Sequence, residues 1–185
     1  MNTGSLEKLR YPIGHFVVPN RISDTTIANW ITELEAFPIA LEDLVRNLSK
    51  DQLETPYRQG GWTIRQVVHH LADSHHNSYI RFKWALTEEK PLVKAYDEKA
   101  WAELFDTRTA PLNLSLNHLK AVHAKLVFLL RGLSREALSR KFVHPDNQAE
   151  ISLVESLGHY AWHGNHHYHH IWNLLKQKGW LLSDV

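Results

Sequence analysis

Apolar residues recur at helical spacing in four long segments, and this periodicity constrains the fold more than any other feature of the sequence. The segments run from about Ser23 to Asn47, from Thr63 to about Thr87, from about Ser115 to Arg131, and from Ser152 to Gly179. Strand-like alternation is nearly confined to residues 139–152, where "PDN" would form the turn of a small hairpin. Four long helices with short excursions between them predict an all-α fold, a four-helix bundle.

Local signals mark several ends of these helices. Thr63 with Gln66, and Ser152 with Glu155, have the spacing of capping boxes, and glycines follow the third and fourth segments. Pro38 lies inside the first segment and predicts a kink. One short helix is expected around "DEKAWAEL". We expect residues 1–185 to form a single domain, with residues 1–22 as an extended N-terminal arm.

The composition excludes several classes of function. The chain has no cysteine, so disulfides, thiolate metal sites and a cysteine nucleophile are ruled out, and any metal must be held by nitrogen and oxygen. A formal net charge of +1, with scattered lysines and arginines, argues against nucleic-acid binding. No window approaches the ~20 apolar residues of a membrane span, and the N-terminus lacks the apolar region of a signal peptide. The expectation is a cytoplasmic protein that binds no membrane.

Histidines are concentrated in the stretch "HYAWHGNHHYHHIW" of the fourth segment. At ~100° per residue, five of them fall on one stripe of the helix, and His169 points elsewhere. The five are His159, His163, His166, His167 and His170. The second segment carries a polar stripe where a bundle helix would normally bury leucine. Its members are Gln66, His70, Asp73, Asn77 and Arg81. Two such stripes are most simply explained if they face each other across a pocket.

A pocket lined by imidazoles favours a metal site. Two histidines at i and i+4 can bind one ion, and a third from a facing helix completes three ligands, leaving room for water or substrate as in catalytic sites. The spacing alone leaves three pairs open: His159 with His163, His163 with His167, and His166 with His170. Asp73 could be a ligand, or an acceptor for a ligand imidazole. A pH switch is the alternative use of the stripe.

The sequence resembles the YfiT group of the DinB-like superfamily over nearly its whole length. The motifs that carry the resemblance are "YPIG", "GGWTIRQVVHHLADSH", "YDEKAW", "HPD" and "YAWHGNHHYHHI". The resemblance implies a four-helix bundle that binds a divalent metal, zinc or nickel, through three histidines. Carried over by motif, these are His70, His163 and His167. The choice agrees with the stripes, since His69 points about 100° away from His70.

The resemblance also implies an activity. Members of the family are described as metal-dependent hydrolases, and closer relatives are regarded as thiol S-transferases that use bacillithiol. The primary expectation is therefore a transferase that joins a small thiol to a small-molecule electrophile, with the metal activating the thiol. The alternatives are hydrolysis by metal-bound water with a spare histidine as acid or base, and a non-enzymatic module that senses metal or pH.

The remaining polar residues near the stripes are expected to serve the reaction. The candidates for orienting ligands or a cofactor carboxylate are Asp73, Asn77, Arg81, His166 and His170. Tyr57 and Arg58, in the loop before the second helix, are expected to border the mouth of the pocket and contact the thiol. Gly164 between the paired histidines reflects close helix packing or an approach of the backbone to the site. Family analogy and the aromatic arm suggest a homodimer.

Overall fold

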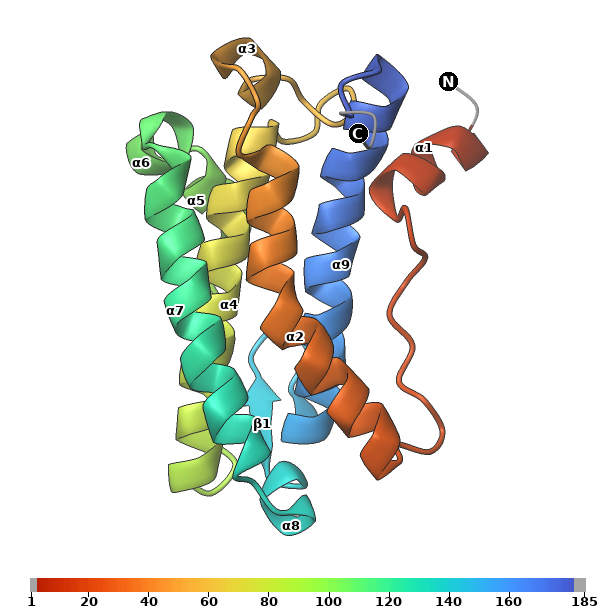
Figure 1. Cartoon of the computed structure of the whole chain (residues 1–185). Coiled ribbons are helices and arrows are strands. Elements are labelled where there is room, and N and C mark those ends of the chain that lie inside the picture. Colours follow the sequence, from red (N-terminus) through yellow and green to blue (C-terminus); the bar gives the residue numbers. More distant parts are fainter. Residues whose placement is uncertain (1–2, 182–185) are drawn as a thin grey trace.

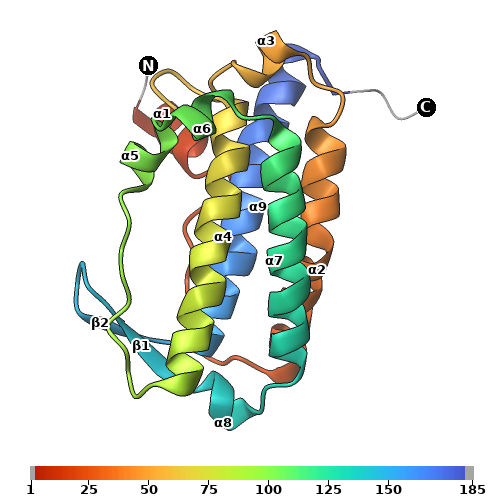
Figure 2. The ribbon, with the colours of Figure 1, turned by 90° about the vertical axis from the view of Figure 1, so that its left-hand side faces the viewer.

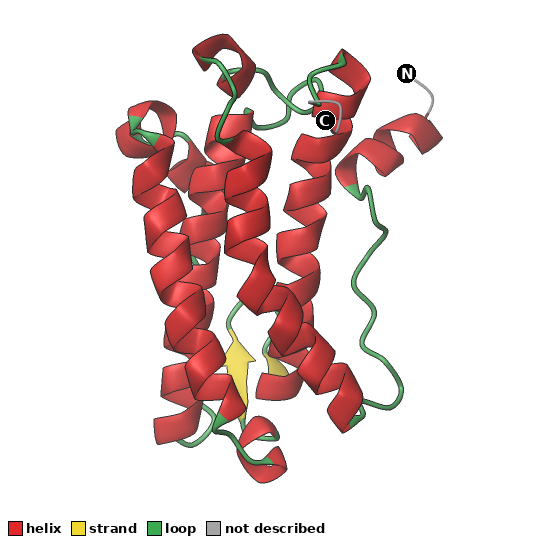
Figure 3. Cartoon of the chain, in the orientation of Figure 1, coloured by secondary structure: helices red, strands yellow, loops and turns green. Residues whose placement is uncertain are grey.

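A computed structural model of the chain describes residues 3–181, with side chains from Leu6 onward. Helices make up most of the fold, and a two-stranded hairpin precedes the last helix (Figure 3). The four long helices are α2 (Asp24–Val45), α4 (Ile64–Thr87), α7 (Leu112–Arg131) and α9 (Leu153–Lys178). The short ones are α1 (Thr3–Arg10), α3 (Lys50–Leu53), α5 (Glu98–Ala102), α6 (Phe105–Thr109) and α8 (Arg135–Leu138). The expected four-helix bundle is confirmed.

The bundle places α4 and α2 on opposite corners, each packed between α7 and α9. Figures 1 and 2 show that α4 and α7 run in the same direction, as do α2 and α9. A long connection, residues 88–111, therefore climbs the side of the bundle between α4 and α7, and it carries α5 and α6. Among residues 3–181, no helix is both long and apolar enough to cross a membrane.

The helix ends follow the local signals in the sequence. Both predicted capping boxes are present, at the starts of α4 and α9, and Gly179 ends α9 in the left-handed conformation with φ 67°. The hairpin pairs β1 (Lys141–His144) with β2 (Ala149–Ser152), as expected. Pro38 lies inside α2, whose axis changes direction part-way along its length in Figure 1.

Three local expectations need correction. Residues 3–10 are helical instead of extended, because "LEKLR" consists of strong helix formers. The region expected to hold one short helix holds two, α5 and α6, and α7 begins three residues earlier than Ser115, after Pro111. From Tyr11 the chain has no regular secondary structure and runs down the side of the bundle to α2 (Figure 1).

The core consists of two apolar clusters, one toward each end of the bundle. The first gathers Leu34, Phe82, Leu126 and Leu157, and the second gathers Leu41, Leu71, Leu119 and Ile171. Buried histidines, including His75 and His123, lie between the residues of the two clusters along α4, α7 and α9. The bundle therefore has a polar layer at the level of its paired histidine stripes.

Candidate metal centre

Three histidines from two helices converge between α4 and α9. One ring nitrogen from each of His70, His163 and His167 lies within 4.8 Å of the others. The Nε2 atoms of His70 and His163 are 3.4 Å apart. Two nitrogens that share a tetrahedral zinc ion at the usual ~2.0–2.1 Å lie about 3.3 Å from each other. The cluster is therefore one that could bind a single metal ion.

The electrostatics of the cluster suit a cation. Burial lowers the pKa of His70 to about 4. Burial also holds the pKa of His163 and His167 well below the usual value, and neighbouring imidazoles lower it further. All three rings are neutral at pH 7, so each keeps the lone pair that a metal ligand needs.

The cluster opens into a cavity of about 360 Å³. Trp62 forms one wall, with its ring centroid 4.6 Å from that of His70. Tyr96, from the long connection, and His144 and Asp146, from the hairpin, line the cavity further out. The three histidines thus lie at the wall of a cavity that is shaped by elements outside the four long helices.

A second cavity of about 380 Å³ adjoins the first. The two share Arg81, His144, His159 and Tyr160 as lining residues. Eight residues line only the second cavity, and apolar atoms make up most of its surface. Four of the eight are apolar, Phe16, Val18, Phe142 and Ile151, and four are polar or charged, Asn147, Glu150, Glu155 and Ser156. The cavity beside the three histidines therefore adjoins a second cavity whose surface is mostly apolar.

A second histidine group shares His167 with the first. His166, His167 and His170 also place one nitrogen each within 4.8 Å of the others. Neither His166 nor His170 lines the cavity of about 360 Å³. The ring of His166 stacks on Trp162 with its Nδ1 buried and unpartnered, and burial lowers its pKa to about 3. Of the two groups, the first is the one whose three members all line this cavity.

The other predicted site residues on α4 separate into two sets. Arg81 lines both cavities. Asp73 and Asn77 do not line the cavity beside the histidines, because the face of α4 that reaches it carries His70, Ser74 and Arg81. The Asn77 amide donates to the Asp73 carbonyl, and burial, with the nearby Asp106, raises the pKa of Asp73 to about 6.

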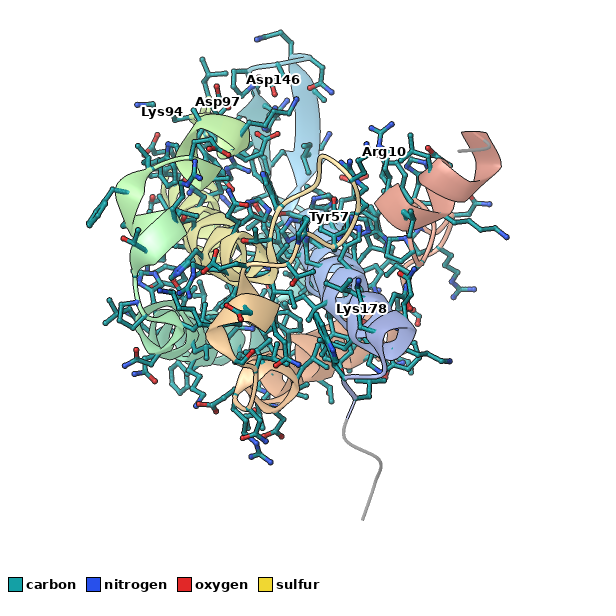
Figure 4. The ribbon with its side chains drawn as sticks, turned by 90° about the horizontal axis from the view of Figure 1, so that it is seen from above. Arg10, Tyr57, Lys94, Asp97, Asp146 and Lys178 are labelled. Carbon is teal, nitrogen blue, oxygen red and sulfur yellow. The ribbon has the colours of Figure 1, made fainter. Side chains whose placement is uncertain are left out.

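Tyr57 and Arg58 pack over the second histidine group instead of lining the cavity. The Tyr57 ring stacks on His170 with centroids 4.1 Å apart, and the Arg58 guanidinium lies over the Tyr57 ring. In Figure 4, viewed from above, the loop that carries Tyr57 crosses over α4 and α9. This loop covers the end of the site next to His170.

Sequence reasoning missed several residues of the site. Tyr96 and Ser74 share a hydrogen bond in the cavity wall, and burial raises the pKa of Tyr96. His75 and His123 lie completely buried behind His163. A usable signal existed for His123, since it stands in the apolar stripe of α7 between Leu119 and Leu126.

Gly164 allows α2 to pack closely against the ligand helix. A Cβ atom at this position would lie 3.2 Å from the Phe37 ring. Phe37 in turn stacks on His75 and His123, with centroids 5.9 and 5.8 Å away. Of the two readings of Gly164, close helix packing is the one that the structure supports.

Comparison with known proteins places this geometry in a family. A family model described as DinB superfamily matches residues 33–171. "Putative metal-dependent hydrolase YfiT" of Bacillus subtilis is 49% identical over 172 residues, which cover 93% of this chain and 97% of the relative. "Putative metal-dependent hydrolase OB0782" of Oceanobacillus iheyensis is 49% identical over 171 residues, which cover 92% of this chain and 98% of the relative.

Solved structures agree with the sequence comparison. The structure of YfiT from Bacillus subtilis superimposes with a TM-score of 0.92 over 94% of this chain and 99% of that chain. A second structure, described as a four-helix bundle protein, has a TM-score of 0.53 at 21% identity and shows the fold alone. The chain belongs to the DinB superfamily, within the group of YfiT.

Proposed function

We propose that this protein is a metal-dependent thiol S-transferase in which His70, His163 and His167 hold one divalent ion, zinc or nickel. When bound, such an ion lowers the pKa of a coordinated thiol and so supplies a nucleophile. The observation that carries the proposal is the pairing of two cavities, one beside the histidines and one apolar, that meet at Arg81. The thiol would bind in the cavity beside the histidines, and the electrophile would bind in the apolar one.

Arg81 is suited to bind the thiol substrate through a carboxylate. Its side chain is buried, and it donates to the Tyr160 hydroxyl at 3.3 Å and the Lys94 carbonyl at 3.2 Å. Its Nε is buried without a partner, and no carboxylate oxygen of residues 6–181 forms a salt bridge with it. A buried guanidinium without a counter-ion favours a carboxylate ligand, which cysteine, glutathione and bacillithiol all carry.

The apolar cavity would hold the electrophile. In the transfer, the sulfur forms a bond to the electrophilic carbon, and the leaving group departs with the electron pair of the broken bond. The proton of the thiol passes to the imidazole of His159, which lines both cavities. Burial, and then the charge of Arg81, lower the pKa of His159, so its ring is neutral and able to accept a proton at pH 7.

The first test joins metal content to thiol dependence. Elemental analysis of the protein and of the double variant His163→Ala, His167→Ala should find about one equivalent of metal in the first and none in the second. Turnover of a chromogenic aryl halide should require a thiol when bacillithiol, cysteine, glutathione and no thiol are compared. Absence of metal from both proteins would contradict the proposal and favour the pH-sensing module.

Arg81 provides a second and sharper test. Arg81→Met should raise the KM for cysteine and leave the KM for cysteamine, which lacks the carboxylate, nearly unchanged. Equal effects on the two thiols would contradict the assigned role of Arg81.

Hydrolysis is the second candidate, and the names of the relatives favour it. The same three histidines would hold the ion, and the same cavities would accept a single ester or amide. Metal-dependent cleavage of an ester without any thiol, together with no thiol-dependent turnover, would establish the hydrolase in place of the transferase.

A further inference from the structure

A row of three histidines links the candidate ligand His163 to the far side of the bundle. The Nδ1 of His163 lies 3.2 Å from Nε2 of His75, and Nδ1 of His75 lies 2.8 Å from Nε2 of His123. The Nδ1 of His123 lies 2.6 Å from the backbone carbonyl oxygen of Leu34. We call His163, His75 and His123 the histidine chain. With Leu34 it includes one residue from each of the four long helices.

The terminal carbonyl sets the direction of every hydrogen bond in the histidine chain. A carbonyl oxygen only accepts, and a neutral imidazole carries one N–H. His123 must therefore donate from Nδ1, which leaves its Nε2 to accept from Nδ1 of His75. By the same step, Nε2 of His75 accepts from Nδ1 of His163. The proton of His163 is thus on Nδ1, and its Nε2 presents a lone pair to the metal cluster.

Pro38 explains why the Leu34 carbonyl is available. In an α-helix the carbonyl of residue 34 would accept from the N–H of residue 38, and proline has none. Leu34 as a whole is 1% exposed, so its carbonyl oxygen is buried in the core. Leaving a buried carbonyl unpaired is costly, and His123, itself 1% exposed, satisfies it.

The candidate ligand His167 has a shorter arrangement of the same kind. Its Nδ1 lies 3.3 Å from Nδ1 of His170, and Nε2 of His170 lies 3.0 Å from the carbonyl oxygen of Arg10. Arg10 is the last residue of α1, where helix carbonyls have no partner within the helix. The carbonyl again requires an N–H from its neighbour, so His170 donates from Nε2 and accepts at Nδ1. His167 then keeps a bare Nε2.

We propose that His75, His123 and His170 are positioning residues that fix the ring orientation and the tautomer of His163 and His167, with the Leu34 and Arg10 carbonyls as the fixed ends. The proposal builds on the metal site proposed above, but the tautomers it assigns exist without metal. Outer partners of this kind commonly hold a ligand imidazole in place, and their loss typically weakens metal affinity 10–100-fold. Phe37, stacked on both His75 and His123, keeps their rings aligned.

The tautomers can be measured directly in the metal-free protein. Long-range ¹H–¹⁵N correlation spectra of ¹⁵N-labelled protein at pH 7.5 should show His163, His75, His123 and His167 protonated on Nδ1. His170 should be the exception, protonated on Nε2. Protonation of His163 or His167 on Nε2 would overturn the proposal. A protein that shows the expected tautomers yet takes up no zinc would instead overturn the proposed function alone.

Metal affinity tests the positioning role without relying on activity. His75→Leu removes the acceptor for His163 and should weaken zinc binding about 10–100-fold in competition with a chromophoric chelator. His75→Gln places an amide oxygen near the position of Nε2 and should recover most of that loss. Affinity that is unchanged in His75→Leu, or equally low in both variants, would contradict the proposal.

His69 offers a matched control on the same helix. It is also buried, but its hydrogen bonds go to Ser115 at 2.7 Å and to the Ala110 carbonyl at 3.3 Å, away from the cluster. His69→Leu should therefore leave zinc affinity within about 3-fold of the parent protein. If His75→Leu does not fold, His170→Leu and His170→Asn test the branch of His167, outside the α2–α4–α7 contacts. The amide oxygen of His170→Asn lies near the position of Nδ1, which is the accepting atom of His170. A loss shared by His69→Leu would mean that any buried histidine has this effect, which would also contradict the proposal.

Discussion

Acid should unfold the metal-free protein because its core holds neutral histidines. Burial is the largest cause that lowers the pKa of His70, His123 and His170, each to about 4. In the unfolded chain these groups return to about 6.5. As the pH falls, the unfolded state therefore binds more protons than the folded state. Stability contributed by the neutral rings is therefore present above pH ~6.5 and lost as the pH falls toward ~4.

The size of this effect follows from the pKa differences. At pH 5 the unfolded histidines lie about 1.5 pH units below their pKa, which costs about 2 kcal/mol for each group. Asp73 acts in the opposite direction, since its folded pKa of about 6 lies above its unfolded value. Its contribution is at most about 1 kcal/mol after allowance for its partial exposure. Three histidines at about 2 kcal/mol each, less about 1 kcal/mol for Asp73, give a net loss of about 5 kcal/mol between pH 7 and pH 5. A typical domain has a total stability of roughly 5–15 kcal/mol.

Urea unfolding measures this loss. The free energy of unfolding of chelator-treated protein, followed by circular dichroism at pH 7 and pH 5, should fall by about 5 kcal/mol. His123→Gln removes one of the titrating groups, so its loss should be smaller by about 2 kcal/mol. A fall of less than about 1 kcal/mol in the parent protein would show that the buried rings are not held neutral. It would refute the reasoning on which the lone pairs of the cluster depend.

Three further predictions concern packing, capping and metal. Gly158→Ala would place a Cβ 2.8 Å from the Trp30 ring and should cost about 1–3 kcal/mol of stability in urea unfolding. Gly132→Ala, whose nearest neighbour is 3.5 Å away, is the control and should cost less than ~1 kcal/mol. Thr63→Ala should cost ~1 kcal/mol through loss of the α4 capping box, whereas Thr63→Ser should be nearly neutral. Zinc at a hundred times its Kd should stabilise the protein by about 2.7 kcal/mol, measured as a rise in Tm that disappears in His163→Ala; an equal rise in that variant would exclude His163 as a ligand.

The long helices could be predicted because their signals are local. The residues Thr63 and Gln66 satisfy each other within one helical turn, so the start of α4 depends little on the rest of the fold. The stripe of histidines on α9 is equally local, and it placed His163 and His167 on the face that meets His70. The short helix α1 was missed although its helix formers, "LEKLR", are also a local signal.

The partners of the candidate ligands could not be predicted from one helix at a time. His75 contacts His163 and His123 only because α4 packs against both α9 and α7. Asp73 was expected at the site because a stripe on a helical wheel is wider than the face that the cavity uses. The observed face of α4 shifts from Asp73 to Ser74, and a rotation of this size is decided by packing.

The histidine layer between the two apolar clusters also bears on how the helices are aligned along their axes. Leucines of one cluster could pack nearly as well after a helix slid by one turn, about 5.4 Å, because apolar contacts have little directionality. The bond from His123 to the Leu34 carbonyl has no such freedom, since the same slide would leave both groups buried and unpaired. Pro38 thus specifies the register of α7 against α2. A residue usually regarded as a helix breaker here helps to fix how two helices are aligned along their axes.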